Sequence, residues 1–118
     1  MDLWRDSVGL PPESINKAFS LSLDEIKERN WCQRFIELMH NRMILGAYRY
    51  GIITDPSTPQ YDNISGAKKR IKLYEDTGNL EGLVDAANLV MIEFVRSRHP
   101  NKHFTDTGES TERVSRSK

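Results

Sequence analysis

The sequence predicts an all-α protein, a small helical bundle of about three helices. Apolar residues recur at spacings of three and four along three segments, which is the period of an amphipathic helix. Residues with side-chain oxygens stand where these segments begin, and glycine or proline stands where they end. No segment alternates apolar and polar residues over the length of a strand, so no sheet is predicted.

The first helix is expected to run from about residue 23 to residue 48. Ser22 and Glu25 have the spacing of a capping box, in which each side chain accepts a hydrogen bond from the other residue's backbone N–H. A bend is expected near Asn30. Gly51, followed by a segment with two prolines, ends the helix because proline cannot continue it.

Two further helices are expected, over about 64–77 and 80–98. Asp62 or Asn63 can cap the second helix, and Gly78 is suited to end it. The second helix carries an apolar stripe at three-four spacing, formed by Ile64, Ala67, Ile71 and Tyr74.

The helical domain is expected to occupy residues 21–104. Residues 1–20 contain a Pro-Pro pair and are predicted to form an irregular arm, and the polar segment 105–118 is predicted to be a disordered tail. Three helices make a thin bundle, and their apolar faces are wider than one such bundle needs. We therefore expect the bundle to be completed by oligomerisation with further copies of the chain.

Composition excludes several classes of partner. Lys and Arg total 17 and Asp and Glu total 17, so no general attraction to nucleic acid or to an anionic membrane is expected. A single cysteine, Cys32, excludes an internal disulfide framework and fits a reducing compartment; it is expected to be a buried, inert thiol. No apolar run approaches the roughly 18 residues of a membrane span, and the first residues do not read as a signal peptide. These features predict a cytoplasmic protein with no membrane partner.

The third helix carries a narrow polar line, Glu81, Asp85 and Asn88, at spacings of four and three. Apolar or small residues border this line on both sides, and no Lys or Arg lies between Leu80 and Val95, whereas an ordinary solvated face would be broader and would contain them. At about 100° per residue, the expected core face of the helix is formed by Leu80, Leu83, Val84, Ala87, Val90, Met91, Phe94 and Val95.

Two interpretations of the polar line remain open. Glu81 and Asp85 lie one turn apart, and Mg²⁺ takes one or two carboxylates with water and phosphates in its other positions. Alternatively, the line is a boundary between core and solvent, with Asp85 paired to a cation on another helix. Arg42 lies near the centre of the apolar face of the first helix, where a charge needs a partner, and Asp85 or Glu81 is its expected counter-ion. Arg42, or Arg49 two turns on, is also suited to bind a phosphate.

Two more charged residues are candidates with a plainer alternative. Glu37 is a third carboxylate, but it points more than about 90° away from the apolar face of its helix. It is expected to be solvated unless the site is shared between subunits. Lys69 belongs to a basic stretch over 68–72, which is usually a solvated face and which also suits a polyphosphate.

The chain resembles the all-α nucleoside triphosphate pyrophosphohydrolases of the MazG-like group, and small phage-encoded proteins related to that group. In those phage proteins a helix ending in Arg-Tyr-Gly is followed by a basic helix, an acidic helix and a His-Pro turn. The matching segments are "RFIELMHNRMILGAYRYG" (34–51), "AKKRIKLYE" (67–75), "LVDAANLVMIEF" (83–94) and "HPNKHF" (99–104).

The resemblance implies a Mg²⁺ ion held on the phosphates of a nucleotide, and attack by water that releases pyrophosphate. The family holds its metal with a Glu-Glu-x-x-Glu motif on a first helix and a Glu-x-x-Asp motif on a later one. Glu81 and Asp85 match the later motif with one residue more between them, and Glu37 is a single acid where the first motif has three. The implied catalytic and metal residues are Glu81 and Asp85, with Glu37 as a third metal ligand. If the chain acts in this way, we expect Arg42, Arg49 and Lys69 to bind the phosphates and Asn88 to help orient the ligand.

Two other functions are weighed beside hydrolysis. One is a nucleotide-binding module without catalysis, which sequesters or senses a nucleotide, including a signalling nucleotide of host defence. The other is an interaction protein in which the polar line is purely structural.

Overall fold

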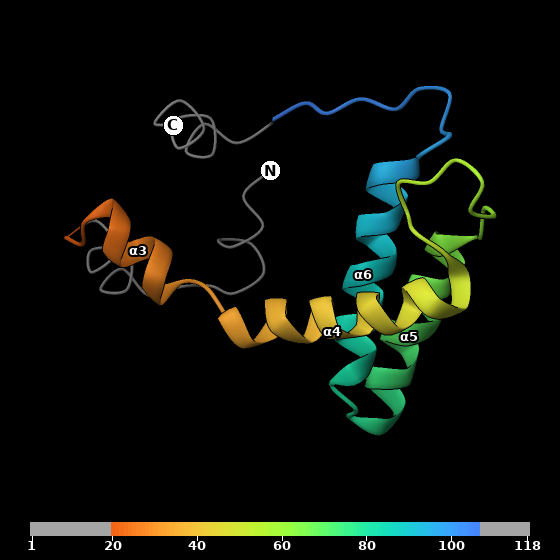
Figure 1. Ribbon diagram of the computed structural model, residues 1–118. Helices are drawn as coiled ribbons and strands as arrows, with labels where there is room; N and C mark the ends of the chain where they lie inside the picture. Colours follow the sequence, from red (N-terminus) through yellow and green to blue (C-terminus); the bar gives the residue numbers. More distant parts are fainter. Residues whose placement is uncertain (1–19, 107–118) are drawn as a thin grey trace. The chain divides into compact units, whose positions relative to one another are not determined.

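The computed structural model describes residues 20–106, and this part of the chain contains four α-helices and no strand (Figure 1). The predicted all-α fold is therefore confirmed. None of these helices is long and apolar enough to cross a membrane. The predicted arm over 1–20 and tail over 105–118 lie almost wholly outside the described residues. The helices are α3 (Leu23–Arg29), α4 (Gln33–Tyr50), α5 (Asn63–Thr77) and α6 (Glu81–Arg96).

The chain divides into two compact units, of which residues 32–102 form one. The described part of the other unit contains α3. The predicted capping box of α3 is present: the Ser22 hydroxyl accepts the Glu25 backbone N–H, and the Glu25 carboxylate accepts the Ser22 backbone N–H, both at 3.1 Å. Both bonds join residues three positions apart, so the local sequence alone determines where α3 begins.

The prediction of one helix from residue 23 to residue 48 is wrong, since two helices occupy this stretch. Asn30 has φ −108° and ψ 40°, which is not helical, and it ends α3. Cys32 then caps α4, because its sulfur accepts the backbone N–H of Phe35 at 3.4 Å. Cys32 is exposed, so the expectation of a buried thiol is also wrong. An N-cap inside an apolar pattern starts a new helix even though the pattern continues across it.

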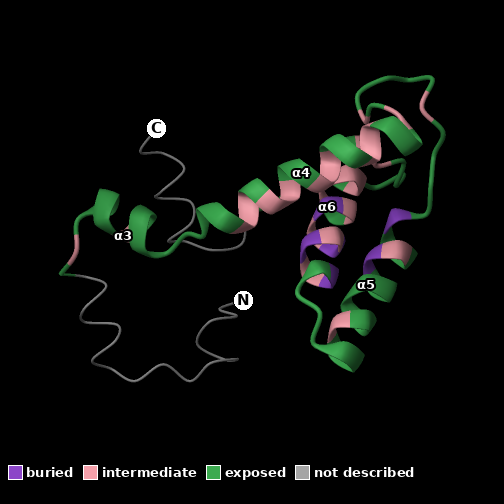
Figure 2. Ribbon diagram, turned by 60° about the horizontal axis from the view of Figure 1, so that its bottom comes forward, coloured by how far each residue is buried: buried purple, intermediate pink, exposed green. Residues whose placement is uncertain are grey.

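Within residues 32–102, α5 and α6 lie side by side and α4 crosses α6 (Figures 1 and 2). The turn between α5 and α6 depends on Gly78, which has φ 75° and donates its N–H to the Tyr74 carbonyl at 2.7 Å. Gly51 ends α4 at φ 98°, and the Asp62 carboxylate caps α5 by accepting the Ser65 N–H at 3.0 Å. The predicted start and end signals of α5, and the glycine that ends α4, are confirmed.

The contact between α5 and α6 is built on small side chains. Ala67 of α5 and Gly82 and Ala86 of α6 are all buried. A Cβ atom added at Gly82 would lie 2.6 Å from the backbone carbonyl oxygen of Arg70. The two helix backbones therefore approach so closely that only glycine fits at this point.

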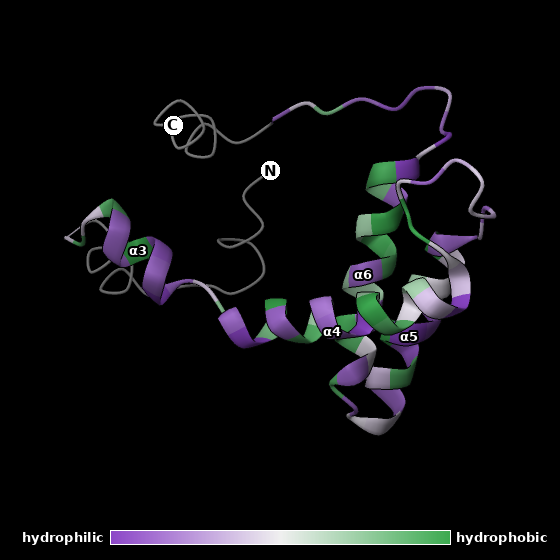
Figure 3. Cartoon of the chain, in the orientation of Figure 1, coloured by the Kyte–Doolittle hydropathy of each residue, from purple (hydrophilic) through white to green (hydrophobic). Residues whose placement is uncertain are grey.

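Because of this close approach, the face of α6 that is buried differs from the core face predicted from the sequence. Of the predicted core face, Val84 is buried, but Val90 is 52% exposed and Phe94 is 75% exposed. The face is exposed because α5 covers the side of Gly82 and Ala86, while α4 covers the side of the polar line. Figure 3 shows that α6 is nevertheless strongly hydrophobic along much of its length. The prediction of one core face centred on Leu80 is wrong for the single chain.

The apolar stripe predicted for α5 is also only partly buried. Ala67 is buried and Tyr74 is half-buried, whereas Ile64 and Ile71 are exposed. The buried face of α5 instead includes Asn63, which precedes Ala67 by one turn. The helix presents its small and polar residues to α6, since large side chains would hold the backbones apart.

Two alanine substitutions test the close approach of α5 and α6. Gly82→Ala should lower the free energy of unfolding by about 1–3 kcal/mol, because the new methyl group meets the backbone of α5. Gly46→Ala is the matched control, since a Cβ there meets nothing within 4 Å; it should raise stability by about 0.5–1 kcal/mol. Urea unfolding of both variants measures the difference. Equal stabilities for the two variants would show that the helices do not touch at Gly82.

Candidate functional site

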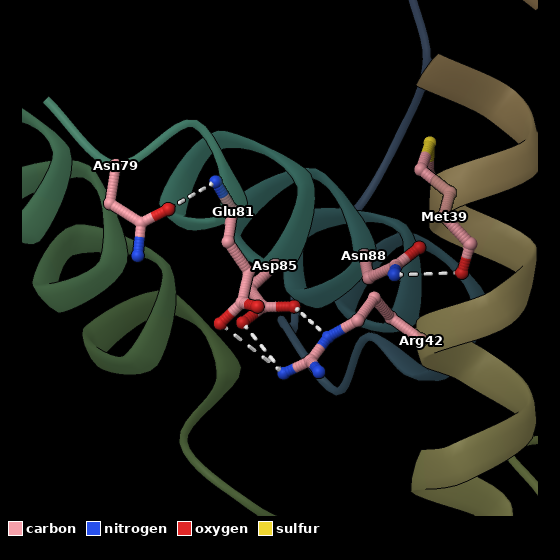
Figure 4. Close-up of polar contacts among 6 residues, drawn as sticks. All are labelled: Met39, Arg42, Asn79, Glu81, Asp85 and Asn88. Carbon is pink, nitrogen blue, oxygen red and sulfur yellow. Dashed lines mark hydrogen bonds and ion pairs between the residues drawn. The ribbon is translucent and has the colours of Figure 1, made fainter. Parts of the chain in front are cut away.

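Arg42 of α4 and Asp85 of α6 form a bidentate ion pair (Figure 4). The Arg42 Nε donates to Asp85 Oδ1 at 3.0 Å, and the Arg42 Nη2 donates to Asp85 Oδ2 at 3.2 Å. The Asp85 side chain is only 14% exposed. The counter-ion predicted for Arg42 is therefore present, and two parallel charge-assisted bonds fix the guanidinium plane against α6.

Glu81 approaches the same guanidinium from one helical turn away. Its Oε1 lies 3.7 Å from Arg42 Nη2, and its side chain is 54% exposed. The Asp85 hydrogen bond, and then the charges of Asp85 and Glu81, raise the pKa of Arg42, while partial burial opposes the shift. Arg42 is therefore a permanent cation at the point where the carboxylates of Glu81 and Asp85 converge.

Asn88, the third member of the polar line, also faces α4. Its Nδ2 donates to the backbone carbonyl of Met39 at 3.0 Å (Figure 4). Asn88 is 5% exposed, and its Oδ1 is buried without a hydrogen-bond partner in the described structure. The polar line of α6 thus forms the contact with α4, and one of its acceptors, Asn88 Oδ1, has no hydrogen-bond partner there.

A hollow of about 150 Å³ lies beside the ion pair, between α4, α5 and α6. Three arginines line it, together with Asp85 and Asn88; we call it the arginine hollow. Within residues 20–106, the side chains of Arg49 and Arg70 make no hydrogen bond and no ion pair. The hollow therefore carries excess positive charge, since Asp85 is already paired with the third arginine, Arg42.

The predicted site residues are only partly brought together. Four of them line the hollow, namely Arg42, Arg49, Asp85 and Asn88. Glu81 does not line the hollow, but its carboxylate lies near the Arg42 guanidinium. Glu37 and Lys69 are exposed and do not line it. Among the described residues, no group of three or more Asp, Glu, His or Cys side chains is placed to hold a metal.

Arg70 is the charged residue of the hollow that was not predicted individually from the sequence. In the sequence it looks like one more member of the basic stretch of the second helix. Its spacing gives the missing signal: Asn63, Ala67, Arg70 and Tyr74 follow one another at intervals of four, three and four, so they share one face of α5. Once Ala67 is known to face α6, Arg70 must lie on the same side.

The carboxylates of Glu81 and Asp85 suit a divalent metal in number and type. They are two acceptor groups that already converge on one cation, and Mg²⁺ is commonly bound by one or two carboxylates with phosphates and water. Arg42 competes for the same oxygens. Glu81 and Asp85 can therefore hold the metal together only when the Arg42 guanidinium moves away from Asp85.

Comparison of the chain with known protein families, with curated protein sequences and with solved structures gives no match.

The two carboxylates differ in what they contribute to stability. Asp85→Ala should cost about 1–3 kcal/mol, because it leaves the half-buried Arg42 without its partner. Glu81→Ala should cost less than about 0.5 kcal/mol, because that contact is longer and exposed. Denaturant unfolding, with Arg42→Ala and the Arg42/Asp85 double variant, gives the coupling energy. Equal and negligible losses for both carboxylates would show that the ion pair does not hold α4 on α6.

Proposed function

We propose that the chain binds the phosphates of a nucleoside triphosphate in the arginine hollow. The observation that carries this proposal is the presence of three guanidinium groups in one hollow, two of them without a partner among the described residues. Guanidinium groups bind phosphate oxygens in a bidentate way, and a half-enclosed site strengthens such bonds. The resemblance to the MazG-like group supports a nucleotide as the ligand. We also propose that the protein acts in the cytoplasm of a host cell.

The ion pair supports binding in a direct way. Asp85 would repel a polyphosphate if its carboxylate were free, but both of its oxygens accept hydrogen bonds from Arg42. The remaining charge of the hollow comes from Arg49 and Arg70, which are available to a ligand. A module that binds a nucleotide without catalysis needs nothing further, so this form of the proposal stands first.

Mg²⁺-dependent pyrophosphohydrolysis is the second candidate, and a separate observation favours it. Glu81 and Asp85 point at one place, 3.7 Å and 3.0 Å from atoms of the same cation. These two carboxylates would hold the metal, and Arg42 would then be released toward the phosphates. A bound Mg²⁺ supplies charge neutralisation on the phosphates and a more acidic water.

The exposed apolar face of α6 supports association with a second copy of the chain. Five residues follow one another at intervals of three and four, the spacing of a helix that packs along another helix. No charged residue belongs to this row, so two copies can meet without burying a charge. We call the row the α6 seam; it is formed by Leu80, Leu83, Ala87, Val90 and Phe94.

A nucleotide titration with matched variants tests the binding proposal. Arg70→Gln and Arg49→Gln should each weaken binding of a nucleoside triphosphate about tenfold, which is the loss of one charge-assisted contact worth about 1.4 kcal/mol. Lys69→Gln is the matched control, because it removes one positive charge from the neighbouring position outside the hollow. Calorimetry measures all four proteins. Equal weakening by Lys69→Gln would mean that the exposed basic face binds the ligand and the hollow does not.

Pyrophosphate release separates the two candidates. The wild-type chain is incubated with a panel of ribonucleoside and deoxyribonucleoside triphosphates and Mg²⁺, and released pyrophosphate is assayed beside the melting temperature. Release that disappears in Glu81→Gln supports hydrolysis, whereas a raised melting temperature without release supports the binding module. If no nucleotide changes either quantity, both candidates are wrong and the polar line is structural.

Disruption of the α6 seam tests self-association. Phe94→Glu should shift the protein to the monomer, because Phe94 is 75% exposed in the single chain and its apolar contact would be replaced by a charge. Ile44→Glu is the control, since Ile44 is also exposed but lies on α4, two residues after Arg42 and hence on the side of that helix turned away from α6. Sedimentation equilibrium measures the mass. A wild-type chain that stays monomeric at high concentration would contradict the proposal.

A further inference from the structure

A second cavity, of about 290 Å³, adjoins the arginine hollow. The two cavities share residues of α4, α5 and α6, among them Gly46, Tyr50 and Arg70. The second cavity is bounded on its far side by Tyr61 and by the segment between α4 and α5. We call it the tyrosine pocket. A molecule with a charged end and a flat apolar end could extend across both cavities.

The segment that bounds the tyrosine pocket is held in place by several contacts. Arg96 of α6 donates to the backbone carbonyls of Thr58 at 2.6 Å and Pro59 at 3.2 Å. The Thr58 hydroxyl donates to the Ile52 carbonyl at 2.7 Å. The pocket is therefore formed before any ligand arrives, which reduces the entropy that binding would cost.

Asn63 gives the pocket one buried polar group. Asn63 lines the pocket and is 5% exposed, yet its side-chain amide makes no hydrogen bond to any described residue. The polar atoms of this amide are not among the fully buried groups without a partner, so they are open to the pocket, whose lining also includes Asp62 and Arg96. A ligand in the pocket can therefore replace water on the Asn63 amide. An amide offers a donor and an acceptor in one plane, as the edge of a nucleobase does.

The aromatic rings of the pocket suit a flat ligand. The rings of Tyr50 and Tyr61 meet edge to face, with centroids 5.7 Å apart and planes at 76°. One ring can therefore present its face to a third ring, and stacking on an aromatic side chain tolerates every base. A volume of about 290 Å³ is close to the lower end of small-molecule sites, roughly 300–1,000 Å³, and suits one ring system.

We propose that the tyrosine pocket takes the base of a nucleotide whose phosphates lie in the arginine hollow. This inference rests on the proposed function and assigns the part of the ligand that the arginines do not bind. Asn63 hydrogen-bonds the edge of the base, and a tyrosine ring stacks on it. The protein therefore distinguishes a nucleotide from an inorganic polyphosphate.

Gly46 marks the junction between the two cavities. On α4 it lies between the positions of Arg42 and Arg49 on one side and those of Met43 and Tyr50 on the other. It lines both cavities, and a Cβ added there would meet nothing within 4 Å. The absence of a side chain leaves a path along which the ligand joins the two cavities, and a large side chain would close it.

Calorimetric titration with a nucleoside triphosphate and with inorganic tripolyphosphate separates the base from the phosphates. The wild-type chain should bind at least one of a panel of nucleotides about tenfold or more tightly than tripolyphosphate. Asn63→Ala should lose about tenfold for that nucleotide and nothing for tripolyphosphate. Gly46→Leu should abolish the preference for the nucleotide, whereas Gly46→Ala should keep most of it. Thermal unfolding shows which variants are folded. If Asn63→Ala is unfolded, the two Gly46 variants still test the proposal.

The outcomes distinguish this inference from the function on which it rests. If nucleotides and tripolyphosphate bind equally tightly, and Gly46→Leu changes neither, the base pocket is wrong while phosphate binding stands. If neither ligand binds the wild-type chain, the proposed function fails and this inference fails with it.

Discussion

The ion pair between Arg42 and Asp85 is the interaction on which the arrangement of the site depends. Two hydrogen bonds between planar groups fix both the distance and the rotation of α4 against α6. Arg49 lies seven residues beyond Arg42, which is nearly two whole turns, so it faces the same side of α4. Asn88 adds a second bond to α4, one turn before Arg42, at the Met39 carbonyl. The polar line of α6 thus orients α4, and with it Arg49, one of the two arginines that we assign to phosphate binding.

The packing of α5 against α6 uses mainly small side chains. Gly82 lets α5 approach α6 until a Cβ atom would meet the α5 backbone, and this contact places Arg70 beside the arginines of α4. Several large apolar side chains of α6, such as Val90 and Phe94, are left exposed. A helix whose small residues are buried and whose large apolar residues are exposed is suited to pack against a second protein chain as well. The proposed association along the α6 seam and the proposed ligand binding in the hollow would therefore use different faces of the same helix.

Local signals in the sequence predicted most helix boundaries, although not the break between α3 and α4, and predicted the rotations of the helices poorly. Caps and breaks act within four residues, so Asp62, Gly78 and the Ser22–Glu25 box could be assigned without knowledge of the fold. The pairing of Arg42 was also predicted, since a cation on an apolar face needs a carboxylate and the polar line of the third predicted helix contains two, Glu81 and Asp85. Rotation depends on which residues touch between helices, and the contact at Gly82 is not visible in a hydrophobic period. For the same reason Arg70 was not separated from its solvated neighbours.

The central claim is that Arg49 and Arg70 bind the phosphates while Arg42 stays on Asp85. NMR of the arginine side chains tests it most directly, by following each Nε–H signal during titration with a nucleoside triphosphate in the absence of Mg²⁺. The account predicts large shifts for Arg49 and Arg70, and an Arg42 signal that remains protected from exchange by its bond to Asp85. Unchanged Arg49 and Arg70 signals at saturating nucleotide would contradict it.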